Sequence, residues 1–311
     1  MKIFLSLLIS WLAFPLLTAQ TSRLDSTAGH ATMHSLFDRQ NLTAWCVVPF
    51  DARKRGPEER AEMLQRLGFQ SFAYDWRQKD VPTFDAEVDA VKKRGIDLVA
   101  WWFPQDPDDP VAKVILEVAR RHGIHPQLWV MGSGSPVTTA EQQAQRVEQE
   151  AERIRKIADL AAPYGCQVHL YNHNGWFGQP DNEVAVIERL KQTGVTGVGM
   201  VYNFSHGHGD LADFPAIWKR IQPYVVAVNI TGMVVNGADH VIPPSQGDRE
   251  LEMMRTIQES GWRGPVGLIA EQGGDAEVTL GNNLRGLDWL REELAAPGSG
   301  RKRPSFGSVG R

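Results

Sequence analysis

Residues 167–192 read QVHLYNHNGWFGQPDNEVAVIERLKQ, and this stretch contains one complete unit of the fold. Its first seven residues have the apolar character of a half-buried strand, whose side chains alternate between two faces. One of those faces carries His169, Tyr171 and His173. A polar turn with aromatic residues and glycine follows, and residues 183–192 have the apolar spacing of an amphipathic helix. A row of titratable side chains that leads into a loop is more typical of a functional site than of a core.

The same unit recurs between residues 44 and 294, where short apolar runs alternate with stretches of helical spacing. The predicted strands are residues 44–48, 71–74, 97–103, 126–131, 167–173, 197–203, 225–231 and 266–271. The predicted helices are residues 58–67, 84–94, 110–122, 139–162, 183–192, 211–221, 249–260 and 278–294. Eight strand–helix units predict a single-domain α/β fold, the (β/α)8 TIM barrel. A doubly wound open sheet is the alternative, but no glycine-rich dinucleotide fingerprint follows the first strand.

The two ends of the chain differ from its middle. Residues 1–19 combine a basic start, a short apolar run and a small residue, which predicts a secretory signal peptide and a periplasmic or secreted protein. An uncleaved anchor is the alternative, although the apolar run is short for a membrane span. Residues 20–40 are then a lead-in and residues 41–295 the barrel. Residues 296–311, rich in Gly, Ser, Pro and Arg, are predicted to be a disordered tail.

Composition narrows the class of protein. The 311 residues carry a formal charge of −4, which argues against a nucleic-acid-binding protein. Two cysteines, Cys46 and Cys166, do not make a disulfide framework, and each lies in or beside an apolar run. We expect two buried thiols, with one disulfide left open in an oxidising compartment.

The predicted strand ends carry most of the chemistry, and the active sites of barrels form at the C-terminal ends of their strands. Aromatic faces suit the C–H faces of sugars, and amides suit their hydroxyls. We predict Glu271, His173 and His206 as catalytic residues, because a carboxylate at the end of an apolar strand is costly to bury and imidazoles suit acid–base work. The predicted substrate-binding residues are Asp75, Arg77, Trp102, Tyr171, Asn172, Trp176, Asn203 and Asn229.

Several of these residues also have a purely structural interpretation. Trp102 could fill the barrel, and Asp75 could pair with Arg77. His169 lies deeper in its strand and is more typical of a core histidine, while His208 could cap the following helix. We expect structural or solvent-facing roles for three further histidines, His122, His125 and His240.

The chain resembles the sugar phosphate isomerase/epimerase superfamily of xylose isomerase-like TIM barrels, and within it an exported branch. The resemblance lies in the strand–helix rhythm and in YNHNGWFG at residues 171–178. It extends to the SHGH sequence that follows at residues 205–208 and to DRELEMMRTIQESGWRGPVGL at residues 248–268.

The resemblance implies a divalent cation, commonly manganese, held by a glutamate, an aspartate, a histidine and a glutamate at the ends of the last four strands. The corresponding residues here are Tyr171, Asn203, Asn229 and Glu271, so only the last keeps its type. Neutral amides and a tyrosine bind a divalent cation weakly, which places a manganese or zinc cofactor in doubt. A displaced site built from His173, His206 and Glu271 is the alternative.

The resemblance also implies an isomerase or epimerase that removes a proton next to a carbonyl of a sugar or keto-sugar. A keto-sugar lyase or hydratase of glycan degradation is an alternative, because it begins with the same proton removal. A non-catalytic carbohydrate-binding barrel with a degenerate metal site is another. The expected partner is a small carbohydrate, and homo-oligomerisation is left open.

Overall fold

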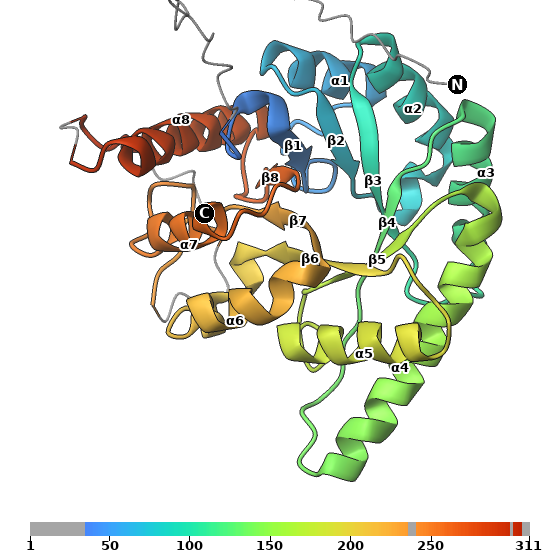
Figure 1. Cartoon of the computed structure of the whole chain (residues 1–311). Coiled ribbons are helices and arrows are strands. Elements are labelled where there is room, and N and C mark those ends of the chain that lie inside the picture. Colours follow the sequence, from blue (N-terminus) through green and yellow to red (C-terminus); the bar gives the residue numbers. More distant parts are fainter. Residues whose placement is uncertain (1–34, 236–240, 299–300, 307–311) are drawn as a thin grey trace, which may run out of the picture. The chain divides into compact units, whose positions relative to one another are not determined.

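The computed structural model describes residues 35–235, 241–298 and 301–306. Eight parallel strands close into a barrel in chain order, and eight helices surround it (Figure 1). The strands are β1 (Leu42–Trp45), β2 (Ser71–Tyr74), β3 (Asp97–Phe103), β4 (Gln127–Val130), β5 (Val168–Tyr171), β6 (Gly199–Asn203), β7 (Val225–Asn229) and β8 (Val266–Ile269). The helices are α1 (Pro57–Arg66), α2 (Phe84–Lys93), α3 (Pro110–His122), α4 (Ala140–Ala161), α5 (Pro180–Gln192), α6 (Phe214–Ile221), α7 (Glu250–Glu259) and α8 (Ala276–Ala295). The predicted single-domain TIM barrel is confirmed.

Several strands end earlier than their apolar runs predict. β5 ends at Tyr171, two residues before its predicted end, and β8 likewise ends at Ile269. In both places the backbone turns at once, since the N–H of His173 bonds to the carbonyl of Tyr171 and that of Gln272 to Ala270. The residues that leave the strand ladder begin the loops at the C-terminal mouth of the barrel.

The barrel interior is filled by aromatic rings. Trp45 lies 4.4 Å from Trp129 between ring centroids, and Trp129 lies 4.8 Å from Trp102. Tyr171 stacks on Trp129 at 6.0 Å. Gly267 makes room for this group, because a Cβ there would lie 2.3 Å from the Trp45 ring. Trp102 thus fills the barrel, in agreement with its structural interpretation, and the indoles of Trp45, Trp102 and Trp129, which we call the indole plug, separate the two ends of the barrel.

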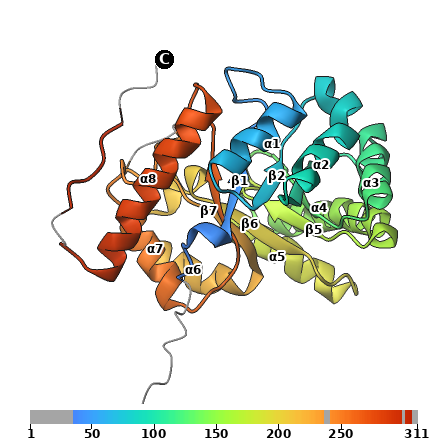
Figure 2. The same cartoon turned by 90° about the horizontal axis from the view of Figure 1, so that it is seen from above.

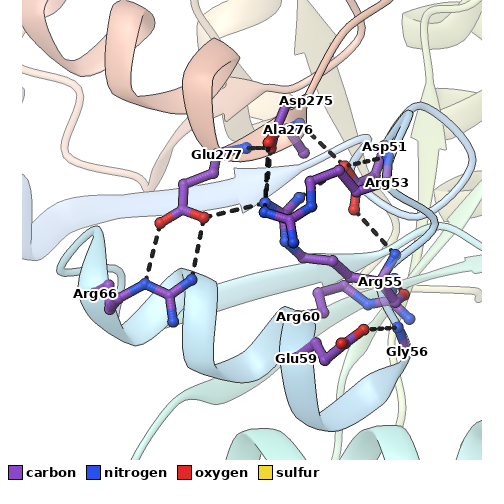
Figure 3. Close-up of polar contacts among 10 residues, drawn as sticks. All are labelled: Asp51, Arg53, Arg55, Gly56, Glu59, Arg60, Arg66, Asp275, Ala276 and Glu277. Atoms are coloured by element: carbon purple, nitrogen blue, oxygen red, sulfur yellow. Dashed lines mark hydrogen bonds and ion pairs between the residues drawn. The ribbon is translucent and has the colours of Figure 1, made fainter.

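Ion pairs join the loops that follow β1 and β8, the strands that close the barrel (Figure 3). The buried guanidinium of Arg55 donates to Asp51 at 2.8 Å, to Asp275 at 2.8 Å and to Glu277 at 3.1 Å. Asp51 also accepts from the backbone N–H of Ala276 at 3.1 Å. Both loops are thereby held at the mouth of the barrel.

The described part of the C-terminal segment contacts the rest of the chain. Residues 301–306 have no regular secondary structure, but they lie beside α8 (Figure 2). The Arg303 guanidinium donates to the carbonyls of Ser245 and Gly247 and lies 5.5 Å from the Trp289 ring centroid. The disordered tail stays a prediction, and in this structure the cations of residues 301–306 contact carbonyls and rings that are distant in the sequence.

Other predictions have mixed outcomes. Cys46 and Cys166 are buried free thiols, as expected. His122 contacts Asp85 at 2.8 Å, and His125 contacts the carbonyl of Tyr164 at 2.9 Å, so both have structural roles. His240 and residues 1–34, with the predicted signal peptide, lie outside the described residues. Within the described ranges, no helix combines the length and apolarity needed to cross a membrane.

Candidate active site

The floor of the mouth is a chain of neutral side chains at the ends of β5, β6 and β7. The amide nitrogen of Asn229 donates to Oδ1 of Asn203 at 2.7 Å. The amide nitrogen of Asn203 donates in turn to the hydroxyl of Tyr171 at 2.7 Å. All three side chains are buried. We call Tyr171, Asn203 and Asn229 the amide floor.

Local structure fixes the central member of this floor. Asn203 pairs with Asn229 in the register of β6 and β7, so their side chains leave the sheet side by side. Oδ1 of Asn203 also accepts from the N–H and hydroxyl of Ser205, at 3.0 and 2.9 Å, and so caps the short turn that follows. Asn172 ties β5 to β6 instead, because its side chain bonds only to the backbone N–H and carbonyl of Asn203, at 2.7 and 3.3 Å.

Two imidazoles lie beside the floor. The rings of His173 and His206 are 4.5 Å apart between centroids, and they lie 6.3 and 6.0 Å from Tyr171. Burial lowers the pKa of His173. Burial, with smaller effects from His173 and His208, lowers the pKa of His206 to about 3. Both rings are therefore neutral near pH 7 and can accept hydrogen bonds or protons.

Carboxyl groups mark the opposite side of the mouth. Asp75 follows β2, and its Oδ1 accepts from the N–H groups of Val47 and Val48 at 3.1 and 3.2 Å. Burial raises the pKa of Asp75 to about 7. Burial also raises the pKa of Glu271, which follows β8, and the charge of Arg77 opposes that rise. Both carboxyls thus have pKa values shifted towards neutrality, as acid–base groups require.

Arg77 supplies positive charge on the same side. Its guanidinium is exposed, donates to the carbonyl of Trp76 at 2.9 Å and lies 5.8 Å from the Phe50 ring centroid. Its positive charge favours the ionised forms of Asp75 and Glu271, and so opposes the larger rise in their pKa values that burial causes. The backbone contacts of Asp75 replace the predicted pairing between Asp75 and Arg77, so the guanidinium stays available at the mouth.

Cys46 lies between the two carboxyls and was missed as a site residue. It follows β1 directly, and its φ of +51° is in the left-handed region, which is uncommon for a residue with a side chain. Burial raises the pKa of its thiol, and Asp75 and Glu271 add to that rise. The sequence placed Cys46 inside the first predicted strand, residues 44–48, and gave no signal of a site there, because positive φ cannot be read from a cysteine.

Two predicted substrate-binding residues have other roles. Trp176 packs in the outer core, and its ring N–H donates to Gln143 of α4 at 2.7 Å. Trp102 belongs to the indole plug. His169 is a core histidine, as its depth suggested, since its Nδ1 accepts from the N–H of Gly199 at 3.0 Å. His208 contacts the carbonyl of Val234 at 3.1 Å, which ties it to the loop after β7.

The donor set at the mouth does not fit the family's divalent cation. In the described part of the chain, no three or more His, Cys, Asp or Glu side chains form a group that could hold a metal. His173, His206 and Glu271 are not brought together as such a group among these residues, so the displaced site stays a prediction without support from the structure. At the positions of the family ligands, Asn203 already has partners for both ends of its amide. These residues bind one another in place of a metal.

A separate cavity of about 210 Å³ opens at the other end of the barrel. It is lined by residues at the starts of the strands, among them Thr43, Ser71 and Gln127, and bounded by Trp45 and Trp129. The indole plug separates it from the carboxyls and imidazoles of the mouth. We therefore assign the candidate site to the C-terminal mouth.

Comparison with known proteins identifies the family. The family described as xylose isomerase-like TIM barrel matches residues 61–293, and the chain belongs to it. No curated protein matches the sequence. Sugar epimerases are among the solved structures that are similar in fold.

Solved structures share the fold at low sequence identity. The apo 3-keto-D-glucoside 4-epimerase YcjR from E. coli is 16% identical, with a TM-score of 0.60 over 81% of this chain and 99% of that one. A D-allulose 3-epimerase from Methylomonas sp. is 13% identical, with a TM-score of 0.58 over 81% and 98%. An AP endonuclease of family 2 from Brucella melitensis is 18% identical, with a TM-score of 0.56 over 77% and 96%. At these identities the similarity shows the fold alone, and one fold serves several reactions.

Proposed function

We propose that the protein is a sugar isomerase- or epimerase-like enzyme that removes and returns a proton next to a carbonyl of a sugar or keto-sugar. One observation carries this proposal: Tyr171, Asn203 and Asn229, which the resemblance equates with the family's metal ligands, are joined by hydrogen bonds, while Glu271 keeps a carboxyl with a raised pKa at the same mouth. The site thus keeps a candidate base and replaces the cation with a neutral surface suited to hydroxyl groups.

In this mechanism, Glu271 is the base that takes the proton from carbon. A raised pKa strengthens a carboxylate as a base and brings it closer to the pH at which it works. Arg77 supplies positive charge on the side where negative charge develops on the substrate oxygen. The neutral ring of His173 is a second acceptor on the imidazole side. The amide floor, fixed by its own hydrogen bonds, orients the substrate from below.

The amide floor also favours a second candidate, a carbohydrate-binding barrel without catalysis. Three of the four family ligand positions are neutral, and two of those side chains bond to the third. A sugar-binding protein needs no more than such amides and nearby aromatic rings. A keto-sugar lyase or hydratase shares the first step with the isomerase and differs in the product.

Hydrogen–deuterium exchange at carbon tests the proposal. The purified protein is incubated in D2O with a panel of keto-sugars and aldoses, and exchange and products are followed by NMR while bound metal is measured by elemental analysis. We expect exchange at the carbon next to the carbonyl without stoichiometric metal. Epimer or isomer formation supports the main proposal, and loss of water or of a leaving group supports the lyase or hydratase. Sugar binding without exchange supports the binding protein.

Substitution of the base sharpens this test. Glu271→Gln keeps the size and hydrogen-bonding capacity of the side chain but cannot take a proton at neutral pH, and we expect exchange to fall about 100-fold or more. Glu259→Gln, an exposed position at the end of α7, is the matched control and should leave exchange unchanged. Full activity of Glu271→Gln would show that another group is the base.

Export and a small carbohydrate partner form part of the same proposal. Support for export comes from the signal-like residues 1–19. N-terminal sequencing of the protein recovered from the periplasm or medium, with a start near Gln20, would support it, and a full-length chain in the cytoplasmic fraction would contradict it.

A further inference from the structure

Three adjacent strands place two carboxyl groups and a thiol at the same level of the mouth. β1 lies between β2 and β8, with Ala44 opposite Phe72 and Trp45 opposite Ile269. Continuing these registers by one residue beyond Trp45 brings Cys46 level with the end of β2 and with the residue after β8. Asp75 and Glu271 each lie one residue further on, so the carboxyls flank Cys46 on its two sides, in agreement with the effect of both on its thiol.

The two oxygens of Asp75 have different surroundings. Oδ1 accepts two backbone hydrogen bonds, from Val47 and Val48. Oδ2 is buried without a hydrogen-bond partner, and the whole residue is 3% exposed. A carboxylate with one bare buried oxygen is costly, and a proton on that oxygen removes the charge.

The fold needs only one of these oxygens. The turn after β1 is held by Oδ1, which an asparagine would also provide through its amide oxygen. Among the described residues, Oδ2 has no hydrogen-bond partner that would explain a carboxyl at this position. A side chain that keeps a second, unused oxygen at the same mouth as a candidate base is a candidate general acid.

The charged and titratable groups near Asp75 come from every element packed against it. They are Tyr74 at the end of β2, Arg77 on its own loop, Arg60 on α1, Cys46 after β1 and, beyond Cys46, Glu271 after β8. The two arginines favour the charged form of Asp75, and burial outweighs them, so that its pKa rises to about 7. The acid form is thus present at neutral pH without being so stable that it cannot release its proton.

We propose that Asp75 is a second catalytic residue of this site, the general acid that acts opposite Glu271. This inference rests on the proposed function. Glu271 takes the proton from the carbon next to the carbonyl, and the electron pair of the C–H bond moves to form the enediol double bond. The carbonyl π electrons move onto oxygen, which takes the proton from Oδ2 of Asp75. The product is a neutral enediol, with Asp75 as carboxylate and Glu271 as acid. The Asp75 carboxylate then takes the proton from the enediol hydroxyl on the neighbouring carbon, a carbonyl forms there, and Glu271 gives its proton to the former carbonyl carbon, which completes isomerisation and restores both groups. Asp75 thereby neutralises the oxygen charge at a mouth whose side chains do not fit a cation.

Asp75→Asn separates this catalytic role from a structural one. The variant keeps an oxygen for the N–H groups of Val47 and Val48 but has no transferable proton. We expect its melting temperature to stay within a few degrees of the wild type and its kcat for carbon exchange to fall about 100-fold or more, with KM changed less than about threefold. The matched control is Asp97→Asn, which removes an exposed charge at the start of β3 and should leave kcat unchanged.

The pH profile supplies a second readout. An acid must be protonated to act, so the wild-type kcat should be present below the pKa of Asp75 and fall as pH rises through about 7. That alkaline limb should be missing from the residual activity of Asp75→Asn. Infrared difference spectra should also show a protonated carboxyl band in the wild type that titrates over the same range and is absent from Asp75→Asn.

The outcomes distinguish this inference from the proposed function. Exchange in the wild type with unchanged kcat in Asp75→Asn would overturn the role of Asp75 and leave the proposed function standing. An absent infrared band would overturn it as well. No exchange by the wild type on any sugar would refute the proposed function and this role with it. Loss of kcat in a stably folded Asp75→Asn, together with loss of the alkaline limb, supports the inference.

Discussion

Replacement of the central residue of the amide floor should destabilise the protein strongly. Asn203→Ala removes the acceptor of the Asn229 amide and the donor to the Tyr171 hydroxyl, both at 2.7 Å. It also removes the cap on the N–H of Ser205. Asn229 and Tyr171 are buried, so the loss of their partner leaves polar groups away from bulk solvent.

The expected magnitude follows from the number of groups that lose a partner. A buried polar group without a partner costs about 1–3 kcal/mol, and the lost cap adds about 1 kcal/mol. The Asn229 amide and the Tyr171 hydroxyl each lose their bond to Asn203. We therefore expect a loss of about 3–5 kcal/mol in the free energy of unfolding. Tyr171→Phe leaves only the Asn203 amide nitrogen unpaired and should cost about 1–3 kcal/mol.

Urea unfolding followed by tryptophan fluorescence measures both losses. The double variant should lose at least about 1 kcal/mol less than the sum of the single losses, because the two side chains share one hydrogen bond. Asn174→Ala, an exposed asparagine in the loop after β5, is the matched control and should change stability by less than about 0.5 kcal/mol. A loss below about 1 kcal/mol for Asn203→Ala, or strict additivity of the pair, would refute the hydrogen-bonded floor.

Three further predictions concern the surroundings of the site. Arg60→Met should cost about 3–5 kcal/mol in urea unfolding, because it leaves the fully buried Glu87 without its bidentate partner at 2.8 and 2.9 Å; a loss under 1 kcal/mol would contradict the pairing. Arg303→Ala should speed amide hydrogen exchange around Ser245, and unchanged exchange would show that the docked segment does not hold that loop. Burial lowers the pKa of His169 to about 4, below the unfolded value of about 6.5, so its contribution of up to about 3 kcal/mol is present above pH 6.5 and lost as pH falls towards 4. A midpoint urea concentration that does not decrease, relative to that of His169→Gln, when the pH is lowered from 7 to 4.5 would contradict this.

Local periodicity predicted the barrel because each unit carries its own signal. The strand before α5 and the helix itself could be recognised from apolar spacing, and glycines such as Gly123, at φ +60°, end helices in the left-handed conformation. The ends of the strands were less certain, since apolar residues such as Ala270 continue beyond the last ladder pair. Whether such a residue stays in the ladder depends on the neighbouring strand, which the local pattern does not contain.

The candidate site could be predicted only in part, again because a local sequence pattern carries no information on neighbouring strands. Alternation describes the chain only as far as Tyr171, where β5 ends, and His173 lies in the turn that follows. Trp176 was predicted from its place in the same loop, where Gly175 has a φ of +67° and the indole reaches Gln143 of α4. Cys46 shows the same limit at the end of β1. The amide floor itself depends on the register between β6 and β7, which brings Asn203 and Asn229 together and which no single segment specifies.

The ion pairs that close the barrel have a consequence for incomplete chains. Arg55 and Asp275 are 220 residues apart in the sequence, yet they share a hydrogen bond of 2.8 Å (Figure 3). During synthesis, the Arg55 guanidinium emerges long before two of its three carboxylate partners. A chain that stops before Asp275 would leave this buried cation undercompensated, at a cost comparable to much of the stability of a domain. The ion pairs between the loops after β1 and β8 therefore form fully only in a chain that includes Asp275 and Glu277. We expect a shorter barrel to unfold and be degraded instead of persisting as a fragment.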